Sequence, residues 1–192
     1  MATSGFGKTL PICTEDCSGR TFIVTGSNTG IGYETVKRLL LQNASRVIMT
    51  VRNPAAGEKA KAELEAATGK TGVAQVWHLD LASYDSVKGF ANKVISELER
   101  VDVLIENAGV SPVDRTMAEG HHLTVTVNIL STFLLTMLLL PKLSETARKF
   151  NITPHIVILG SSYGFYYLEA WDAIKDDPLA KLDAEEKDIS QK

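Results

Sequence analysis

The stretch T-G-S-N-T-G-I-G at residues 25–32 decides how this chain folds. It lies between a short β-branched run, which predicts a strand, and a helical segment. Its spacing, G-x3-G-x-G, differs from the commoner dinucleotide fingerprint, but the physical requirements are shared. Gly26 allows a sharp turn, Gly30 lets a pyrophosphate approach the backbone, and Gly32 permits close packing of helix on strand. A glycine loop alone fits an ordinary strand–helix turn equally well, but its place after the first strand favours an anion site at the N-terminus of the helix.

Strands and helices alternate along the first 160 residues. Short apolar runs predict strands at 21–25, 46–51, 73–79, 101–105 and 155–159, with helices between them at 31–43, 54–68, 83–98 and 119–143. Strands that are apolar along their whole length are buried on both faces, as in a parallel sheet. The sequence therefore predicts the α/β class, a doubly wound parallel sheet (Rossmann fold) with five visible strands in the order 3-2-1-4-5. Residues 1–17 are expected to be an N-terminal extension and residues 18–192 the dinucleotide-binding domain.

The composition argues against several classes of partner. With 20 Lys and Arg against 23 Asp and Glu, the net charge of −3 gives no reason to expect nucleic acid or an anionic membrane. Cys13 and Cys17 have no second pair and no nearby His, so two reduced thiols are expected. The 4 histidines form no metal-binding motif.

The chain also shows no membrane or targeting signal. The longest apolar stretch, residues 129–140, is shorter than the roughly 20 residues of a membrane span, so we expect a buried helix there and no membrane span. The N-terminus lacks the apolar region of a signal peptide, which favours a cytoplasmic protein.

Arg52 indicates which dinucleotide binds. It stands 20 positions after Gly32, at the end of the second strand, where a carboxylate would bind a ribose 2′-hydroxyl. A carboxylate would repel a 2′-phosphate, whereas an arginine can pair with it. Arg52 therefore favours NADP(H) over NAD(H), and the alternative is a solvated arginine at the end of a strand.

Four further motifs follow the glycine loop in order. They are H-L-D-L at 78–81, E-N-A-G at 106–109, V-N-I-L-S-T-F at 127–133 and I-V-I-L-G-S-S at 156–162. Over roughly residues 18–185 the chain resembles the classical short-chain dehydrogenase/reductase family, especially a fungal branch related to retinol-type dehydrogenases. Glu106 stands where the family has the first Asn of N-N-A-G. The resemblance implies an NADP(H)-dependent oxidoreductase that transfers hydride between the cofactor and a small-molecule carbonyl or alcohol substrate.

The resemblance also implies roles for single residues. Contacts with the phosphates and the adjoining ribose are implied for Gly26, Ser27, Asn28, Gly30, Ile31 and Gly32. Contacts with the adenine are implied for Asp80 and Leu81, and contacts with the nicotinamide-side ribose for Asn107, Ala108 and Gly109. Ser162 would orient the substrate carbonyl, and Asn128 would hold a water in a proton relay. Plainer alternatives are a helix cap for Asp80, a backbone-bonded helix residue for Asn128, and a strand end for Ser161 and Ser162.

The family's catalytic Tyr-x-x-x-Lys does not follow Ser162 in this sequence. The one such pattern, Y-D-S-V-K at 84–88, opens an outer helix beside the adenine half, so we expect a structural role for it. The segment at 171–179 is similar to the insertion that precedes the active Tyr in the fungal branch, so we expect a truncation just before that Tyr and a sheet incomplete on its C-terminal side. The fifth strand would then be a bare apolar edge, which predicts poor solubility or a homo-oligomer.

Two functions remain open on this basis. One is the NADP(H)-dependent oxidoreductase, and the other is a catalytically inactive nucleotide-binding protein or partner subunit that lacks the acid–base pair.

Aromatic residues follow Ser162 closely and fit an apolar substrate pocket or a core equally well: Tyr163, Phe165, Tyr166, Tyr167 and Trp171.

Overall fold

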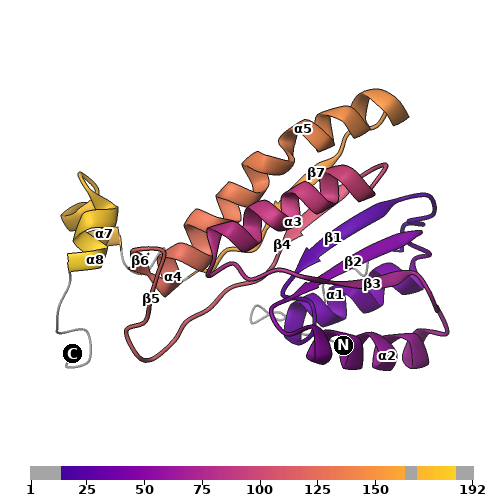
Figure 1. Cartoon of the computed structure of the whole chain (residues 1–192), viewed down its shortest axis with the longest axis horizontal. Coiled ribbons are helices and arrows are strands. Elements are labelled where there is room, and N and C mark those ends of the chain that lie inside the picture. Colours follow the sequence, from indigo (N-terminus) through magenta and orange to yellow (C-terminus); the bar gives the residue numbers. More distant parts are fainter. Residues whose placement is uncertain (1–13, 163–167, 185–192) are drawn as a thin grey trace.

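A five-stranded parallel sheet forms the centre of the computed structural model, which describes residues 14–162 and 168–184. Its strands are β1 (Thr21–Thr25), β2 (Arg46–Val51), β3 (Ala74–His78), β4 (Val103–Glu106) and β7 (His155–Ile158). They lie in the order β3-β2-β1-β4-β7, and every neighbouring pair is parallel (Figure 1). The predicted fold class and strand order are therefore confirmed.

Helices cover both faces of the sheet. One face carries α1 (Gly30–Leu41) and α2 (Pro54–Thr68), and the other carries α3 (Tyr84–Glu97) and α5 (Thr132–Phe150), as Figure 1 shows. Each face has its own hydrophobic core. Ile23 and Val24 are neighbours on β1 and belong to different cores, and both are fully buried. This burial on both faces explains why the strands are apolar along their whole length.

Polar caps fix where α2 and α3 begin. The Asn53 side chain accepts hydrogen bonds from the backbone N–H groups of Ala55 (3.0 Å) and Ala56 (3.3 Å), and Pro54 occupies the first helical position. Ser83 accepts a hydrogen bond from the N–H of Ser86 at 3.3 Å in the same way. The predicted cap at Asn53 is confirmed.

The predicted long helix at 119–143 differs from the observed one at both ends. Residues before it form a short antiparallel hairpin, β5 (Met117–Ala118) and β6 (His121–His122), because Glu119 and Gly120 turn the chain with φ of 53° and 83°. The helix starts with α4 (Leu123–Val125), passes through a π-helical segment η1 (Thr126–Ser131) and continues as α5 to Phe150. Its last turns are polar on the outside, so the apolar pattern gave no sign of them.

Two short helices lie beyond the sheet. They are α7 (Leu168–Ile174) and α8 (Pro178–Ala184), and Figure 1 shows them next to the β5–β6 hairpin. Asp183 joins α8 to the hairpin, because its carboxylate lies 2.6 Å from His121 Nδ1 and accepts the N–H of His122 at 2.9 Å. The hydrogen bond from His121 holds the pKa of Asp183 below its usual value.

The far edge of the sheet is apolar and exposed in the described part of the chain. On β7, Val157 and Ile158 are each 43% exposed, and Leu159 just after it is 39% exposed. On α5 and the segment before it, a stripe of exposed apolar residues recurs at helical spacing: Ile129, Phe133, Met137 and Leu140. The predicted bare edge is present, and self-association through it stays a prediction.

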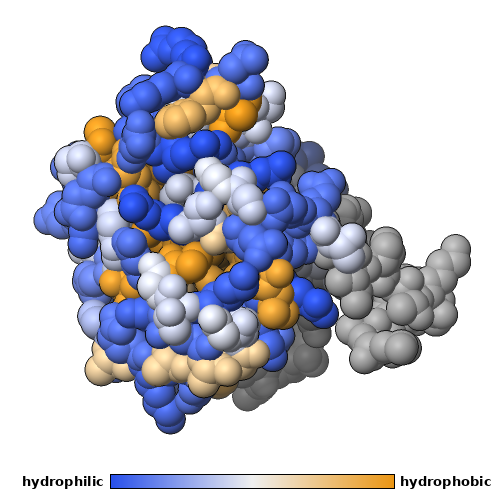
Figure 2. Space-filling view, turned by 90° about the vertical axis from the view of Figure 1, so that its right-hand side faces the viewer, coloured by the Kyte–Doolittle hydropathy of each residue, from blue (hydrophilic) through white to orange (hydrophobic). Residues whose placement is uncertain are grey.

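The continuous helix Leu123–Phe150 is long and apolar enough to cross a membrane by length and composition alone. A core helix of a soluble protein passes the same test, and Leu135, Leu139 and Leu143 are buried against the sheet. The end of the molecule where α5 finishes is mainly hydrophilic with scattered apolar patches (Figure 2). The inner face of this helix is thus a core face, as the sequence predicts.

Of the two cysteines, Cys17 lies in the described part of the chain. Cys17 is buried in the core under α1, and its thiol donates to Gln42 Oε1 at 3.7 Å. Cys13 lies outside the described residues.

Candidate functional site

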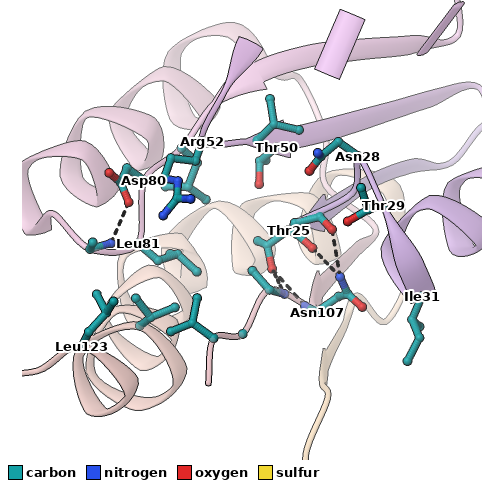
Figure 3. A pocket seen from close by; sticks show the side chains of 18 residues that line it. Thr25, Asn28, Thr29, Ile31, Thr50, Arg52, Asp80, Leu81, Asn107 and Leu123 are labelled. Atoms are coloured by element: carbon teal, nitrogen blue, oxygen red, sulfur yellow. Dashed lines mark hydrogen bonds between the residues drawn. The ribbon is translucent and has the colours of Figure 1, made fainter. Parts of the chain in front are cut away.

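A pocket of about 500 Å³ opens at the carboxyl edge of the sheet. Residues that follow β1, β2, β3 and β4 line it together, and Figure 3 shows their side chains converging on one space. Ligands of open α/β sheets bind at this edge, where neighbouring crossovers run to opposite faces. The pocket lies at that edge because parallel strands bring all their carboxyl ends to one side.

Nine of the residues singled out from the sequence line this pocket. They are Gly26, Asn28, Ile31, Arg52, Asp80, Leu81, Asn107, Ala108 and Gly109. Five others do not line it: Ser27, Gly30, Gly32, Asn128 and Ser162. Their roles in cofactor binding or catalysis stay predictions.

Two of the loop glycines sit where a side chain would collide. A Cβ on Gly26 would lie 2.9 Å from Ala108 Cα, and its φ is +62°. A Cβ on Gly32 would lie 2.5 Å from both Asn107 Nδ2 and the Gly26 carbonyl oxygen. Gly32 therefore permits α1 to pack closely against the ends of β1 and β4, which is the helix–strand packing that the sequence predicts.

The N-terminus of α1 has donors available for an anion. Thr29 precedes the helix without a side-chain cap, and no acidic residue lies in the first turn. Gly30 has φ +58° and faces open space, since an added Cβ would meet no atom within 4 Å. Uncapped N–H groups and the helix dipole together favour a negatively charged group at this place.

Ser27 lies beneath the glycine loop, in contact with β2. It is fully buried, and its N–H and hydroxyl both point to the Thr50 carbonyl oxygen, at 3.3 Å and 3.5 Å. Its side chain therefore joins the loop to β2.

Hydrogen bonds of Thr25 and Asn107 join the ends of β1 and β4. The Thr25 hydroxyl oxygen accepts hydrogen bonds from the N–H groups of Asn107 and Ala108, both at 2.9 Å. In return, Asn107 Nδ2 donates to the carbonyl oxygens of Thr25 (2.8 Å) and Gly26 (3.2 Å), as Figure 3 shows. The sequence places Thr25 at the end of the first strand and the start of the glycine loop, but it gives no sign of these contacts with residues after β4.

Arg52 and Asp80 lie close together on the rim formed by β2 and β3 (Figure 3). Arg52 is exposed, and no hydrogen bond or ion pair within the described residues engages its guanidinium. Asp80 accepts the N–H of Ala82 at 2.9 Å, and its own N–H donates to Ser86 Oγ at 2.9 Å. Ser83 rather than Asp80 caps α3, so Asp80 stabilises the turn before the helix and also faces the pocket.

Asn128 holds the loop that follows β4. Its Oδ1 accepts the N–H of Val110 at 2.8 Å, and its Nδ2 donates to the Val110 carbonyl oxygen at 2.9 Å. The residue lies in the π-helical segment η1. Both ends of its amide are thus bonded to backbone, the plainer alternative for this residue, and its part in a proton relay stays a prediction.

Ser162 and the aromatic cluster belong to the end of the described region. Ser162 is exposed and Trp171 is 51% exposed, so Trp171 is not a core residue. Tyr163, Phe165, Tyr166 and Tyr167 lie outside the described residues. The segment that the resemblance places beside the substrate is therefore described up to Ser162 and again from residue 168.

The Tyr84–Lys88 pattern lies outside the pocket, and the structural role expected for it stays a prediction. Lys88 pairs with Asp85 at 3.4 Å, and neither Tyr84 nor Lys88 lines the pocket. Burial, together with the nearby charge of Glu119, raises the pKa of Tyr84. A catalytic Tyr needs the opposite shift, because a neighbouring Lys lowers its pKa in a proton-transfer pair.

Glu106 is the one strongly perturbed acid near the site. Burial raises its pKa to about 8, against smaller lowering effects of the hydroxyls of Thr25 and Thr136.

The described residues contain no cluster of His, Cys, Asp or Glu that could hold a metal ion. The glycine loop with its uncapped helix N-terminus and the exposed Arg52 suit the pocket to a phosphate-bearing organic ligand.

Known proteins resemble this chain along most of its length. A family model described as short chain dehydrogenase matches residues 20–173. A short chain dehydrogenase/reductase of Cryptosporiopsis sp. is 43% identical over 155 residues, which are 80% of this chain and 48% of that protein. A short-chain dehydrogenase of Penicillium roqueforti is 41% identical over 162 residues, 84% of this chain and 42% of that protein. The chain spans about half the length of these relatives.

Solved structures show the same architecture. A metagenomic short-chain oxidoreductase in complex with NADP matches with a TM-score of 0.61 and 26% identity, over 83% of this chain and 78% of that one. RhlG of Pseudomonas aeruginosa, in an active-site complex with NADP, matches with a TM-score of 0.57 and 28% identity, over 68% and 50% of the two chains. Because the matched family region begins just before β1, ends within α7 and contains every residue that lines the pocket, the chain belongs to the short-chain dehydrogenase family.

Proposed function

We propose that this chain binds NADP(H) and is the cofactor-binding part of a cytoplasmic oxidoreductase that interconverts a carbonyl compound and an alcohol. The observation that carries the proposal is the pairing of an uncapped helix N-terminus with a guanidinium that no described residue engages. Thr29 and Gly30 begin the helix on one side of the pocket, and Arg52 stands on its rim. Two separate places for negative charge fit the diphosphate and the 2′-phosphate of one dinucleotide.

The residues present fit this cofactor in shape as well as in charge. Gly26 and Gly30 leave the loop backbone without side chains on the approach to α1. Leu81 and Asp80 provide an apolar and a polar contact for a base on the β3 side. Asn107, Ala108 and Gly109 form the opposite wall, which suits the nicotinamide half. When bound, the cofactor would supply the hydride, while these residues bind and orient it.

The two solved relatives named above were crystallised with NADP, which supports the same choice for this chain. The relatives are about twice as long, so the substrate and the turnover of the whole protein belong to the proposal too. The described pocket contributes no Tyr-x-x-x-Lys pair to the chemistry.

The test is a change of charge at Arg52. Arg52→Asp should raise the Kd for NADPH about 10-fold to 100-fold, because it replaces a charge-assisted pair with repulsion. The Kd for NADH, which lacks the 2′-phosphate, should change by less than about threefold. Arg148→Asp is the matched control, since Arg148 is exposed on the last turn of α5 and does not line the pocket.

Fluorescence titration of the wild type, Arg52→Asp and Arg148→Asp, each with NADPH and with NADH, gives the six Kd values that test the assignment. If Arg52→Asp left the preference for NADPH unchanged, the assignment of the 2′-phosphate site would be wrong. If the wild-type chain bound neither dinucleotide at millimolar concentration, the proposed function would be wrong altogether. Binding without turnover by the complete protein would favour the alternative of an inactive nucleotide-binding protein.

A further inference from the structure

Glu106 is a buried acid that the proposed cofactor site does not use directly. It is the last residue of β4, only 2% exposed, and does not line the pocket. Its carboxyl lies near the hydroxyls of Thr25 on β1 and Thr136 on α5. Its Oε1 is buried without a hydrogen-bond partner in the described part of the chain. A buried carboxyl with so few partners is costly, so its position calls for a physical reason.

The hydrogen bonds of Thr25 supply that reason. A Thr hydroxyl has one proton to donate and two lone pairs that accept. Both lone pairs of the Thr25 oxygen are in use, because they accept the N–H groups of Asn107 and Ala108 at 2.9 Å each. The single hydroxyl proton must therefore point elsewhere, and Glu106 Oε2 is its acceptor at 3.3 Å.

We propose that Glu106 is a positioning residue for the cofactor pocket, which it controls through the Thr25 hydroxyl. By accepting the hydrogen bond from the Thr25 hydroxyl, the Glu106 carboxyl turns the two Thr25 lone pairs toward the start of the Asn107–Ala108–Gly109 wall. Without an acceptor at residue 106, the hydroxyl can rotate and give up one of these N–H groups. The wall would then lose part of its fixed geometry, and the affinity for the nicotinamide cofactor would fall. This inference rests on the proposed function, since the wall matters only if it contacts the cofactor.

Variants at residue 106 separate the acceptor from the bulk of the side chain. Glu106→Leu keeps a similar volume without an acceptor, and should raise the Kd for NADPH about threefold to tenfold, the usual worth of one hydrogen bond. Glu106→Gln keeps an acceptor oxygen and should stay within about twofold of the wild type. If Glu106→Leu does not fold by circular dichroism, the longer and more flexible Glu106→Met replaces it.

A double-mutant cycle with Thr25 identifies the route of the effect. Thr25→Val removes the hydroxyl and should weaken binding at least as much as Glu106→Leu, whereas Thr25→Ser should not. Because Glu106 acts through this hydroxyl, Glu106→Leu should have no further effect in the Thr25→Val protein. A loss of packing alone would instead make the two effects multiply.

Each result decides the matter. Weaker binding by Glu106→Leu, rescue by Gln and non-additivity with Thr25→Val would support the inference. Unchanged binding by the apolar variant, loss of binding by Glu106→Gln, or multiplying effects would overturn it while leaving the proposed function intact. Failure of the wild-type chain itself to bind NADPH would overturn the proposed function, and the inference with it.

Discussion

Replacing Glu106 with Gln should change how the stability of this protein depends on pH. In the folded chain, burial raises the pKa of Glu106 from the ordinary 4.5 to about 8. Between these two values the folded state holds a proton that the unfolded chain has already released. The contribution of this group is therefore fully present below pH 4.5 and is lost as the pH rises toward 8. Above pH 8 the residue contributes no further change, because both states are ionised.

The structure sets the size of the effect. The folded pKa lies roughly 3.5 pH units above the unfolded one, and each pH unit corresponds to about 1.4 kcal/mol. The upper limit is therefore on the order of 5 kcal/mol, which is as large as the whole stability of many domains. Relaxation and water entry reduce such penalties, so we expect a loss of about 2–5 kcal/mol between pH 5 and 9. Glu106→Gln carries no ionisable proton and should lose this pH dependence.

Urea unfolding followed by circular dichroism at several pH values measures the effect. The control is Glu97→Gln, which removes the same charge from an exposed position on α3 and should keep the wild-type profile. Glu106→Gln should be nearer to the wild type at pH 5 and clearly more stable than it at pH 9. If the two profiles ran parallel within about 0.5 kcal/mol over this range, Glu106 would titrate normally and the argument from burial would be wrong.

Three other substitutions test a close contact of the glycine loop, a helix cap and the exposed apolar stripe of α5. Gly32→Ala should abolish cofactor binding and destabilise the chain, because its Cβ would lie 2.5 Å from two polar atoms; Gly89→Ala, with open space around it, should fold and bind normally in the same titration. Asn53→Ala should lower the free energy of unfolding by about 1 kcal/mol in urea, since α2 loses its cap. Phe133 and Met137 are 53% and 62% exposed, so replacing both with Lys should shift light-scattering masses toward the monomer. An unchanged mass would show that another surface drives association.

Much of the sheet could be predicted from the sequence because its strands are buried on both faces. The bounds of β1, β2 and α2 agree with the prediction to the residue, since β-branched runs and the Asn53–Pro54 start are strong local signals. The hairpin of β5 and β6 was missed because each strand has only two residues. The π-helical segment η1 was missed because its apolar spacing does not differ from that of an ordinary helix.

The candidate site was predictable to the extent that strand ends meet at one edge. Residues such as Arg52, Asp80 and Asn107 could be brought together without coordinates, because the parallel order of the strands places them side by side. The contacts of Thr25 with Glu106 could not, since they join residues 81 positions apart through side chains on one face. The unusual Glu in E-N-A-G was a visible signal, but only the packing of β4 against α5 reveals its neighbours.

The pocket residues that suit cofactor binding differ from those that proton transfer to a substrate would need. The described residues that line the pocket lie between Thr25 and Val127, and the ionisable ones among these are Arg52 and Asp80. An arginine does not give up its proton in proteins, and Asp80 stands on the rim at the β3 side, away from the Asn107 wall. Reduction of a carbonyl needs a proton donor beside the hydride acceptor. We therefore expect the described pocket residues to bind NADPH without supplying the proton, so that any oxidation of NADPH with a panel of aldehydes and ketones depends on a donor outside this lining. Tyr163, Tyr166 and Tyr167 are candidates for this donor, to be replaced one by one with Phe; turnover that depended on Asp80 instead would refute the expectation.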